Sequence, residues 1–246
     1  MNAMDYDYDK TLKGRVHSIF TGGMVDGPGI RCVVFFTGCP LRCKYCHNPD
    51  TWFLDNGMEM SVEEVLRELL KYKKFYKRSG GGVTFSGGEP LSQPEFLCEI
   101  LKACRANKIH TCLDTSGFAP ESSIMDVLPF VDLLLLDIKA ANHETYKRVT
   151  GQKSDRIFAM LGLALRQHVQ TWIRYVLVPG LTDNLDEIRK LADFLREYNN
   201  IEKVDILPFH KLGEDKWKDL GIEYELHDTL PPSPELIQTV REILTV

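Results

Sequence analysis

The sequence predicts an α/β fold, namely a partial (β/α)6 barrel that stays open on one side. Apolar, strand-like runs alternate about six times with helical stretches, and right-handed crossovers wind such units into a parallel sheet. The run from Leu133 to Leu136 is unbroken leucine, which is typical of a strand buried on both faces. A full barrel needs eight units, so six leave a gap in the wall.

The strands of this sheet are expected where apolar and β-branched residues follow turn residues. They lie at residues 31–36, 80–85, 109–114, 131–139, 170–178 and 204–210, and a further short strand is expected at 16–20. Residues 21–29 contain four glycines and one proline, which favours a loop whose backbone can approach a ligand closely.

Helices are expected between the strands, and the first of them carries a clear start signal. Ser61 and Glu64 form a capping-box pattern that opens a helix over 61–76. The other helices are expected from 92, over 122–128, 144–149, 154–168 and 183–198, and from 233 onward. Residues 1–13 are expected to be a disordered acidic tail, residues 211–232 to be irregular, and residues 14–246 to form a single domain.

Composition argues against several classes of function. The chain of 246 residues carries a net charge of −5, which offers no broad attraction to nucleic acid or to an anionic membrane. No apolar run approaches the length of a transmembrane helix, and the amino terminus lacks the pattern of a signal peptide. Seven cysteines, an odd number, fit a reducing compartment in which thiols stay free. The sequence therefore predicts a cytoplasmic protein.

Three cysteines in one loop give the first chemical signal. Cys39, Cys43 and Cys46 are spaced C-x3-C-x2-C after the strand at 31–36, so a short tether lets their thiolates converge on one centre. An iron–sulfur cube takes one cysteine for each iron, and three cysteines would leave one iron open to a ligand. The alternative is a zinc site with His47 as fourth ligand. Adjacent Cys46 and His47 can rarely ligate one ion without strain, and zinc sites more often pair two short clips.

Polar residues follow the predicted strands at their carboxyl ends, where β/α barrels carry their functional groups. Such residues are Gly87, Gly88 and Glu89, then Asp114 and Thr115, then Asp137 and Lys139, and finally His210. Asp137 and Lys139 are two apart, so their side chains share a face, and a buried pair of opposite charges is tolerable where a single charge is costly. Arg174 lies inside an apolar run, where it needs an anionic partner or points to a carboxylate on the outer face.

Several of these motifs, taken in order, resemble a known family. The segments that carry the resemblance are the cysteine motif with Tyr45 before its last cysteine, Asp26-Gly27-Pro28-Gly29-Ile30-Arg31, Tyr45-Cys46-His47-Asn48, Ser86-Gly87-Gly88-Glu89, Asp137-Ile138-Lys139 and Leu207-Pro208-Phe209-His210. From about Gly14 to near the carboxyl terminus, the chain resembles the radical S-adenosylmethionine (SAM) activases of glycyl radical enzymes, in particular those that act on pyruvate formate-lyase. The resemblance implies the same partial barrel of the radical SAM type.

The resemblance also implies a set of cofactors and site residues. Cys39, Cys43 and Cys46 would hold a [4Fe-4S] cluster with one open iron, and SAM would bind there. The residues implied to contact SAM are Tyr45, Cys46, His47, Gly87, Gly88, Glu89, Asp114, Thr115, Asp137, Ile138, Lys139 and His210. The Glu89 carboxylate would suit the SAM ammonium group, and a monovalent cation can be held near Asp114 and Thr115. Asp26, His47 and Arg174 would lie toward the partner peptide.

The implied activity is that of an oxidoreductase of anaerobic pyruvate metabolism. It would cleave SAM reductively and take a hydrogen from a glycine Cα of pyruvate formate-lyase, with a flavodoxin- or ferredoxin-like electron donor. Residues 48–82 contain no cysteine, so the inserted cluster segment of some other activases is not expected. Three alternatives remain: an activase of glycerol dehydratase or anaerobic ribonucleotide reductase, a radical SAM enzyme with a small-molecule substrate, and a zinc-stabilised, non-catalytic interaction module.

Overall fold

A computed structural model describes residues 7–245 and confirms the α/β fold. Eight strands form one open sheet in the order β3-β1-β2-β4-β5-β6-β7-β8. The six strands from β2 to β8 in this order are parallel, whereas β1 pairs antiparallel with both β2 and β3 at one edge. The predicted six-stranded partial barrel is therefore present, with two extra strands that extend its first edge.

The six predicted parallel strands all lie close to their expected positions. The eight strands of the sheet, including the two antiparallel ones, are β1 (Lys13–Gly23), β2 (Arg31–Phe36), β3 (Met58–Ser61), β4 (Gly82–Gly87), β5 (Thr111–Thr115), β6 (Leu133–Asp137), β7 (Gln170–Leu177) and β8 (Ile201–Pro208). β1 is longer than the short strand expected at 16–20, and β3 was not expected. β3 is a four-residue edge strand with two exposed residues at its start, so it has no buried face from which an alternating pattern could be recognised.

The helices occupy the intervals between the strands. They are α1 (Val62–Leu70), α2 (Lys73–Ser79), α3 (Pro94–Ala106), α4 (Glu121–Val127), α5 (His143–Thr150), α6 (Asp155–Arg166), α7 (Leu185–Leu195), α8 (Glu214–Asp219) and α9 (Pro234–Ile243). The capping box of Ser61 and Glu64 is confirmed. The helix expected over 61–76 is two helices, because the Leu69 carbonyl accepts from the Tyr72 N–H and the Tyr76 hydroxyl instead of continuing the ladder.

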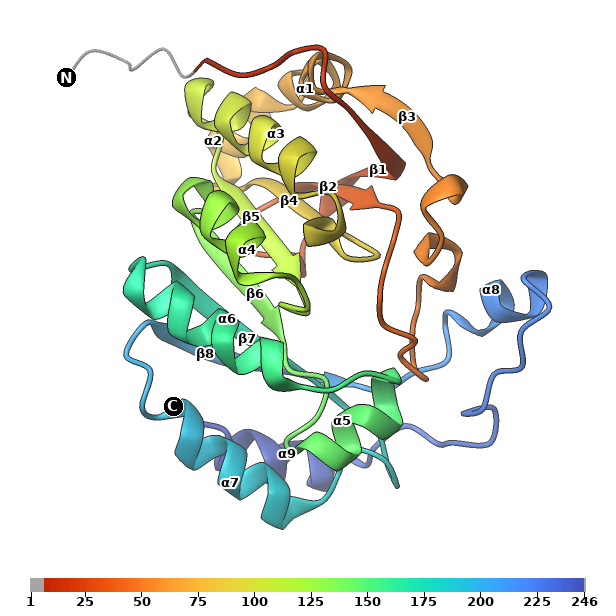
Figure 1. Cartoon of the computed structure of the whole chain (residues 1–246). Helices are drawn as coiled ribbons and strands as arrows, with labels where there is room; N and C mark the ends of the chain where they lie inside the picture. Colours follow the sequence, from red (N-terminus) through yellow and green to blue (C-terminus); the bar gives the residue numbers. More distant parts are fainter. Residues whose placement is uncertain (1–6, 246) are drawn as a thin grey trace.

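The helices α3, α4, α6 and α7 cover one face of the sheet, and the main hydrophobic core lies between them and the strands (Figure 1). Leu134 and Leu136 belong to this core, whereas Leu133 and Leu135 pack with Cys112 in a second cluster. β6 is thus buried on both faces, as its leucine run predicts. Since side chains alternate along a strand, Asp137 faces the same side of the sheet as Leu133 and Leu135, away from the main core.

The expected acidic tail falls partly outside the described residues, because the structure describes nothing before residue 7. Within its described part, the carbonyls of Lys10 and Leu12 accept hydrogen bonds from the first residues of α1, and the Asp9 N–H donates to Glu99 at 2.7 Å. Lys13 is already the first residue of β1. Residues 9–13 are therefore part of the fold, and the single domain over 14–246 stays a prediction.

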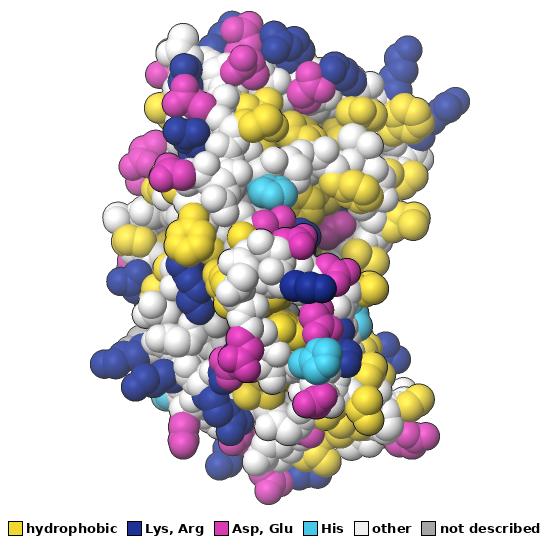
Figure 2. Space-filling model, turned by 90° about the vertical axis from the view of Figure 1, so that its right-hand side faces the viewer, with side chains coloured by type: hydrophobic (Ala, Val, Ile, Leu, Met, Phe, Trp, Pro, Cys, Tyr) yellow, Lys and Arg dark blue, Asp and Glu magenta, His cyan; other side chains and the backbone are white. Residues whose placement is uncertain are grey.

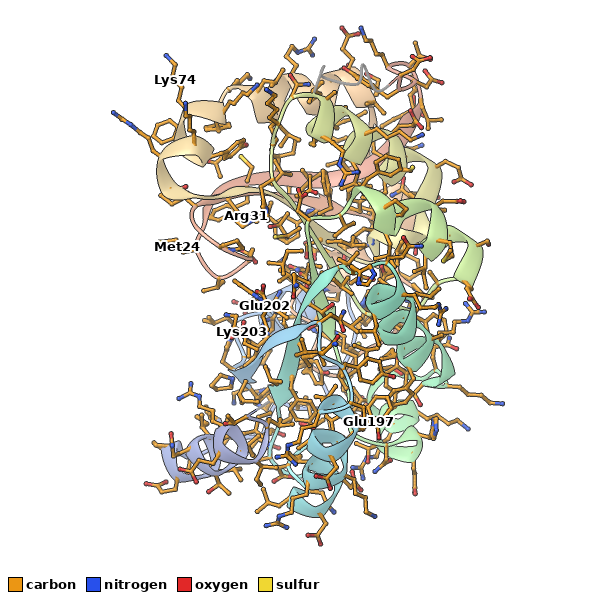
Figure 3. All side chains as sticks on the ribbon, turned by 90° about the vertical axis from the view of Figure 1, so that its left-hand side faces the viewer. Met24, Arg31, Lys74, Glu197, Glu202 and Lys203 are labelled. Carbon is orange, nitrogen blue, oxygen red and sulfur yellow. The ribbon has the colours of Figure 1, made fainter. Side chains whose placement is uncertain are left out.

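The two ends of the parallel strands lie on opposite sides of the molecule. Figure 3 looks onto the side with the amino ends, where Arg31 begins β2 and Glu202 and Lys203 lie at the start of β8. The segment that follows β2 and contains the cysteines lies on the opposite side (Figure 1). Among residues 7–245, no helix is long and apolar enough to cross a membrane.

Candidate active site

A cavity of about 450 Å³ lies at the carboxyl ends of the parallel strands. Most of the predicted site residues line it: Cys39, Cys43, Tyr45, Cys46, His47, Gly87, Gly88, Asp114, Thr115, Asp137, Lys139, Arg174 and His210. Asp26, Glu89 and Ile138 do not. Figure 2 looks onto the right-hand side of Figure 1, the side of the cysteine segment, and there hydrophobic side chains lie beside groups of acidic and basic ones. Residues from six separate segments thus meet at one place, as expected for a β/α barrel.

The cysteine loop is held from both flanks by backbone hydrogen bonds. On one flank, the N–H groups of Arg42 and Lys44 donate to the carbonyls of Thr150 and Val149, at 2.9 and 3.0 Å, in the last turn of α5. On the other flank, the indole N–H of Trp217 in α8 donates to the Cys46 carbonyl at 2.8 Å. These contacts fix the direction of three free thiols into the same cavity.

The three thiols suit a cationic cluster better than they suit solvent. Burial raises the pKa of all three, to about 12 for Cys43, and the neighbouring cysteines raise the pKa of Cys39 further. Thiolates can therefore form here only with a strong counter-charge, which iron supplies. Among residues 7–245, no three His, Cys, Asp or Glu side chains are placed to hold a single metal ion. The three thiols instead line one cavity. This arrangement fits a cluster, in which each cysteine binds a different iron.

His47, the fourth ligand in the zinc alternative, has another partner. Its ring stacks on that of His210 with centroids 4.3 Å apart, and its Nε2 lies 3.1 Å from the His210 carbonyl oxygen. Burial lowers the pKa of His47, so the ring is held neutral at the wall of the cavity. The nearby Tyr45 hydroxyl donates to the Lys139 carbonyl at 3.3 Å, which ties the cysteine loop to the end of β6.

Two ion pairs supply the charge balance of the cavity. Arg174 donates to Asp114 at 3.0 Å, and Lys139 donates to Asp137 at 2.7 Å. Ser86 adds a hydrogen bond of 2.6 Å to the second oxygen of Asp114. Asp114, above all, raises the pKa of Arg174; burial alone would lower the pKa of Lys139, but Asp137 and other anionic groups raise it well above its usual value. Asp114, the carboxylate expected beside a monovalent cation, thus already has Arg174 as a cationic partner within the chain.

The Gly-Gly-Glu turn is built differently from the expectation. Gly87 and Gly88 line the cavity, and a Cβ on Gly87, whose φ is +117°, would lie 2.3 Å from the Phe36 nitrogen. Glu89, however, is 1% exposed and accepts four hydrogen bonds. They come from the Leu91 N–H, the Thr115 hydroxyl, and the N–H and hydroxyl of Ser116, at 3.1, 2.6, 2.9 and 2.6 Å. Its carboxylate therefore joins this turn to the end of β5.

Asp26 and Ile138 do not line the cavity either. The Ile138 side chain belongs to the main core, as expected for the residue between Asp137 and Lys139. The Asp26 carbonyl accepts from the Thr84 hydroxyl at 2.6 Å, and burial, followed by the charge of Asp114, raises the pKa of the Asp26 carboxyl.

Sequence reasoning missed several residues that build the site. Trp217 falls in the segment expected to be irregular, yet it lies in α8 and meets the Trp52 ring edge-on at 5.0 Å. A tryptophan within the otherwise polar stretch of α8 was an available signal. Ser116 carries no motif, and only the fold brings it to the cavity wall.

An open parallel α/β sheet with three convergent thiols at its carboxyl edge defines a class of protein. The model of the radical SAM superfamily matches residues 33–195 of this chain. Solved structures agree: a radical SAM methyltransferase from Sphaerobacter thermophilus aligns with TM-score 0.65 over 94% of this chain and 74% of its own, at 16% identity. At that identity the likeness supports the fold alone.

Relatives narrow the class. The pyruvate formate-lyase-activating enzyme of Clostridium pasteurianum is 50% identical over 217 residues, which cover 88% of this chain and 91% of the relative. The pyruvate formate-lyase 1-activating enzyme of Escherichia coli K12 is 43% identical over 233 residues, 94% and 95% of the two chains. A crystallised domain of such an enzyme from Bacteroides vulgatus aligns with TM-score 0.57 and 30% identity over 67% of this chain and 93% of its own. The chain therefore belongs to the family of pyruvate formate-lyase-activating enzymes within the radical SAM superfamily.

Proposed function

We propose that this chain installs a glycyl radical on pyruvate formate-lyase, using a [4Fe-4S] cluster and SAM. The observation that carries the proposal is that the three cysteines of the loop and the ends of β4 to β8 line the same cavity. The family membership supports it, because relatives that align over most of their length carry this name. When bound, the cluster and SAM supply the electron and the hydrogen-abstracting chemistry, while the protein provides orientation and exclusion of water.

Different residues of the chain are proposed to bind the cluster, to bind SAM and to support the cavity wall. Cys39, Cys43 and Cys46 hold the cluster, and the backbone of Gly87 and Gly88 lies against the aminoacyl end of SAM. The remaining SAM contacts that the resemblance implied are proposed for residues that line the same cavity. Glu89 and Ile138 act from behind the wall by fixing the turn and the strand end. A monovalent cation near Asp114 and Thr115 stays a prediction.

The partner peptide is proposed to enter beside the glycine-rich segment that precedes β2. Val25 lines the cavity and is 78% exposed, and its neighbour Met24 is 77% exposed. Such apolar side chains at a cavity mouth are typical of a protein-binding surface. His47 and Arg174 face the same cavity, and the Asp26 carbonyl ties the segment to β4 by accepting a hydrogen bond from the Thr84 hydroxyl. The reacting glycine must come close to the cofactor, because hydrogen transfer needs near contact.

An electron donor of flavodoxin or ferredoxin type completes the proposal, and basic side chains beside the cysteine loop support it. Arg42, Lys147 and Lys153 are exposed, and none of them forms an ion pair with a described carboxylate. The side chain of Gln152 donates to the Pro40 carbonyl at 3.3 Å, so this part of the chain lies against the cysteine loop. Positive charge there would steer an acidic redox protein toward the cluster. We expect Lys153→Glu, a charge reversal at an exposed side chain, to slow reduction by the protein donor and to leave reduction by dithionite unchanged; equal rates with the protein donor would refute this docking site.

The test of the proposed function is electron paramagnetic resonance on an anaerobic mixture of reduced protein, SAM and pyruvate formate-lyase. A glycyl doublet on the lyase is expected. A doublet only on glycerol dehydratase or on anaerobic ribonucleotide reductase would reassign the partner. SAM turnover that needs no protein partner would indicate a small-molecule substrate, and a colourless protein containing zinc would refute the radical chemistry altogether. The free state of all seven cysteines fits the reducing, cytoplasmic setting that the sequence predicts.

A further inference from the structure

Each cysteine of the loop has its backbone carbonyl held by a separate donor. The Cys46 carbonyl accepts from the Trp217 indole at 2.8 Å, and the Cys43 carbonyl accepts from the Cys46 N–H at 3.0 Å. The Cys39 carbonyl accepts from the Arg42 guanidinium at 2.6 Å. This third donor is an exposed, charged side chain, which needs strong contacts to stay in one place, because ordering a long flexible side chain costs conformational entropy.

The Arg42 side chain has such contacts on two sides. Its Nη1 donates to both the Cys39 and the Leu41 carbonyls, at 2.6 and 2.8 Å, and hydrogen bonds from a charged donor are stronger than neutral ones. Its guanidinium carbon lies 4.9 Å from the centroid of the Trp52 ring and 5.3 Å from that of Phe53, within the range of cation–π contacts. Arg42 thus joins the start of the cysteine loop to the segment that follows its end.

The backbone brings the same two segments together. The Gly38 N–H donates to the Thr51 carbonyl at 2.8 Å, and the Cys39 N–H donates to the Trp52 carbonyl at 3.1 Å. Both backbone groups of Cys39 are therefore held, the N–H by the chain and the carbonyl by Arg42. Because a residue has only two soft backbone dihedrals, fixing the peptide groups on both sides of Cys39 sets the direction in which its thiol enters the cavity.

We propose that Arg42 is a positioning residue for the iron–sulfur cluster, which holds Cys39 in the direction that iron requires and whose charge favours the reduced cluster. The inference rests on the proposed function, in which Cys39 is a ligand. A group held in its bound orientation beforehand loses less conformational freedom on binding. The charge around a cluster is one of the features that set its reduction potential, since a nearby cation stabilises the more negative, reduced state.

The experiment compares wild-type protein with Arg42→Met, Arg42→Lys and Lys44→Met, all loaded with the cluster under anaerobic conditions. Methionine keeps an unbranched apolar stem beside the rings but removes the donor and the charge. Lysine restores both, because a single nitrogen of Arg42 makes both hydrogen bonds and an ammonium group has three donors. Lys44→Met is the matched control: Lys44 lies in the same loop, but its side chain pairs with Glu225 instead of a cysteine carbonyl.

The first measurement is the rate at which a chelator removes iron. It should rise several-fold in Arg42→Met and stay near the wild-type rate in Arg42→Lys and Lys44→Met. The second is a potentiometric titration, followed by the electron paramagnetic resonance signal of the reduced cluster without SAM. In Arg42→Met the ratio of reduced to oxidised cluster at a fixed potential should fall about threefold, which for a one-electron couple corresponds to about 28 mV. Lys44→Met should change this ratio less, because Glu225 offsets the charge of Lys44.

A wild-type rate of iron release or a wild-type potential in Arg42→Met would overturn the inference, and so would equal changes in Arg42→Met and Lys44→Met. Urea unfolding of the iron-free proteins separates a role toward the cluster from a role in folding. A larger fall of the urea midpoint in Arg42→Met than in Lys44→Met would also overturn the inference, because Arg42 would then act on the fold. If the proposed function is wrong because no cluster is held, the wild type itself contains no iron. If only the role of Arg42 is wrong, all four proteins hold the cluster and lose iron at one rate.

Discussion

Replacing Glu89 by glutamine tests whether this carboxylate contacts SAM or supports the site from behind. The resemblance assigned it to the SAM ammonium group, whereas the structure places four protein donors on its two oxygens. An amide keeps the size of the side chain but replaces one acceptor oxygen by a donor. Whichever way the amide turns, it therefore faces at least one protein donor that it cannot satisfy, and up to two hydrogen bonds are lost.

The magnitude follows from those bonds. A hydrogen bond to a charged group contributes about 1.5–3 kcal/mol, so losing two of them would cost roughly 3–6 kcal/mol. Burial raises the pKa of Glu89, which means that its charge is itself costly in this place. The neutral amide recovers part of that cost. We therefore expect Glu89→Gln to lower the free energy of unfolding of the iron-free protein by about 3 kcal/mol, at the low end of the range.

The assay is urea unfolding of the iron-free protein together with SAM binding to the cluster-loaded protein. Glu95→Gln, the same change at an exposed position in α3, is the control and should shift stability by less than about 0.5 kcal/mol. Wild-type stability in Glu89→Gln combined with a large loss of SAM affinity would refute the reasoning and return Glu89 to direct contact with SAM.

The other perturbations concern the Arg174–Asp114 ion pair, the hydrogen bond from Trp217 in α8 to the cysteine loop, and the cluster itself. Arg174→Ala leaves the Asp114 carboxylate buried without its cation and should cost about 3–5 kcal/mol of unfolding free energy. Adding Asp114→Asn should recover part of this loss, and strict additivity in the double variant would contradict the pairing. Trp217→Phe loses the hydrogen bond to the Cys46 carbonyl, worth about 1 kcal/mol, so a chelator should remove iron several-fold faster. A wild-type rate of iron release would show that α8 does not hold the cysteine loop in place. Stripping the iron should abolish high-affinity SAM binding while circular dichroism keeps its helix signal, because the main core does not include the cysteine loop. Tight SAM binding to the stripped protein would contradict a cluster-bound substrate.

The parallel part of the fold could be predicted because four of its strands, β2, β4, β5 and β6, are buried on both faces. The run Leu133 to Leu136 and the apolar segment at β2 can hardly be anything else in a sequence that alternates with helices. β3 and α8 could not be predicted in the same way. β3 is short and half exposed, and α8 is a six-residue polar helix with one buried tryptophan. Their positions depend on tertiary contacts with β1 and with the cysteine loop rather than on periodicity.

The sequence predicted which strand ends form the site, but it did not predict which way the side chains there point. Motifs that follow successive strands must meet at the carboxyl edge of a parallel sheet, so the gathering of Cys39, Asp114, Lys139 and Arg174 around one cavity needed only the strand order. Which atoms face that cavity depends on side-chain packing. The sequence could not tell that Glu89 would turn to the end of β5, or that the Trp217 indole would reach the Cys46 carbonyl.

The central claim is that Cys39, Cys43 and Cys46, and no other cysteine, hold an iron–sulfur cluster with one iron left for SAM. Iron and acid-labile sulfide analysis of anaerobically reconstituted protein tests it most directly, on the wild type, on each single alanine variant of these three residues, and on Cys104→Ala as a buried control. The expected result is about four irons per chain in the wild type and in Cys104→Ala, with a marked loss in each of the other three variants. Full iron content after loss of any of the three, or stoichiometric zinc in the wild type, would contradict the claim.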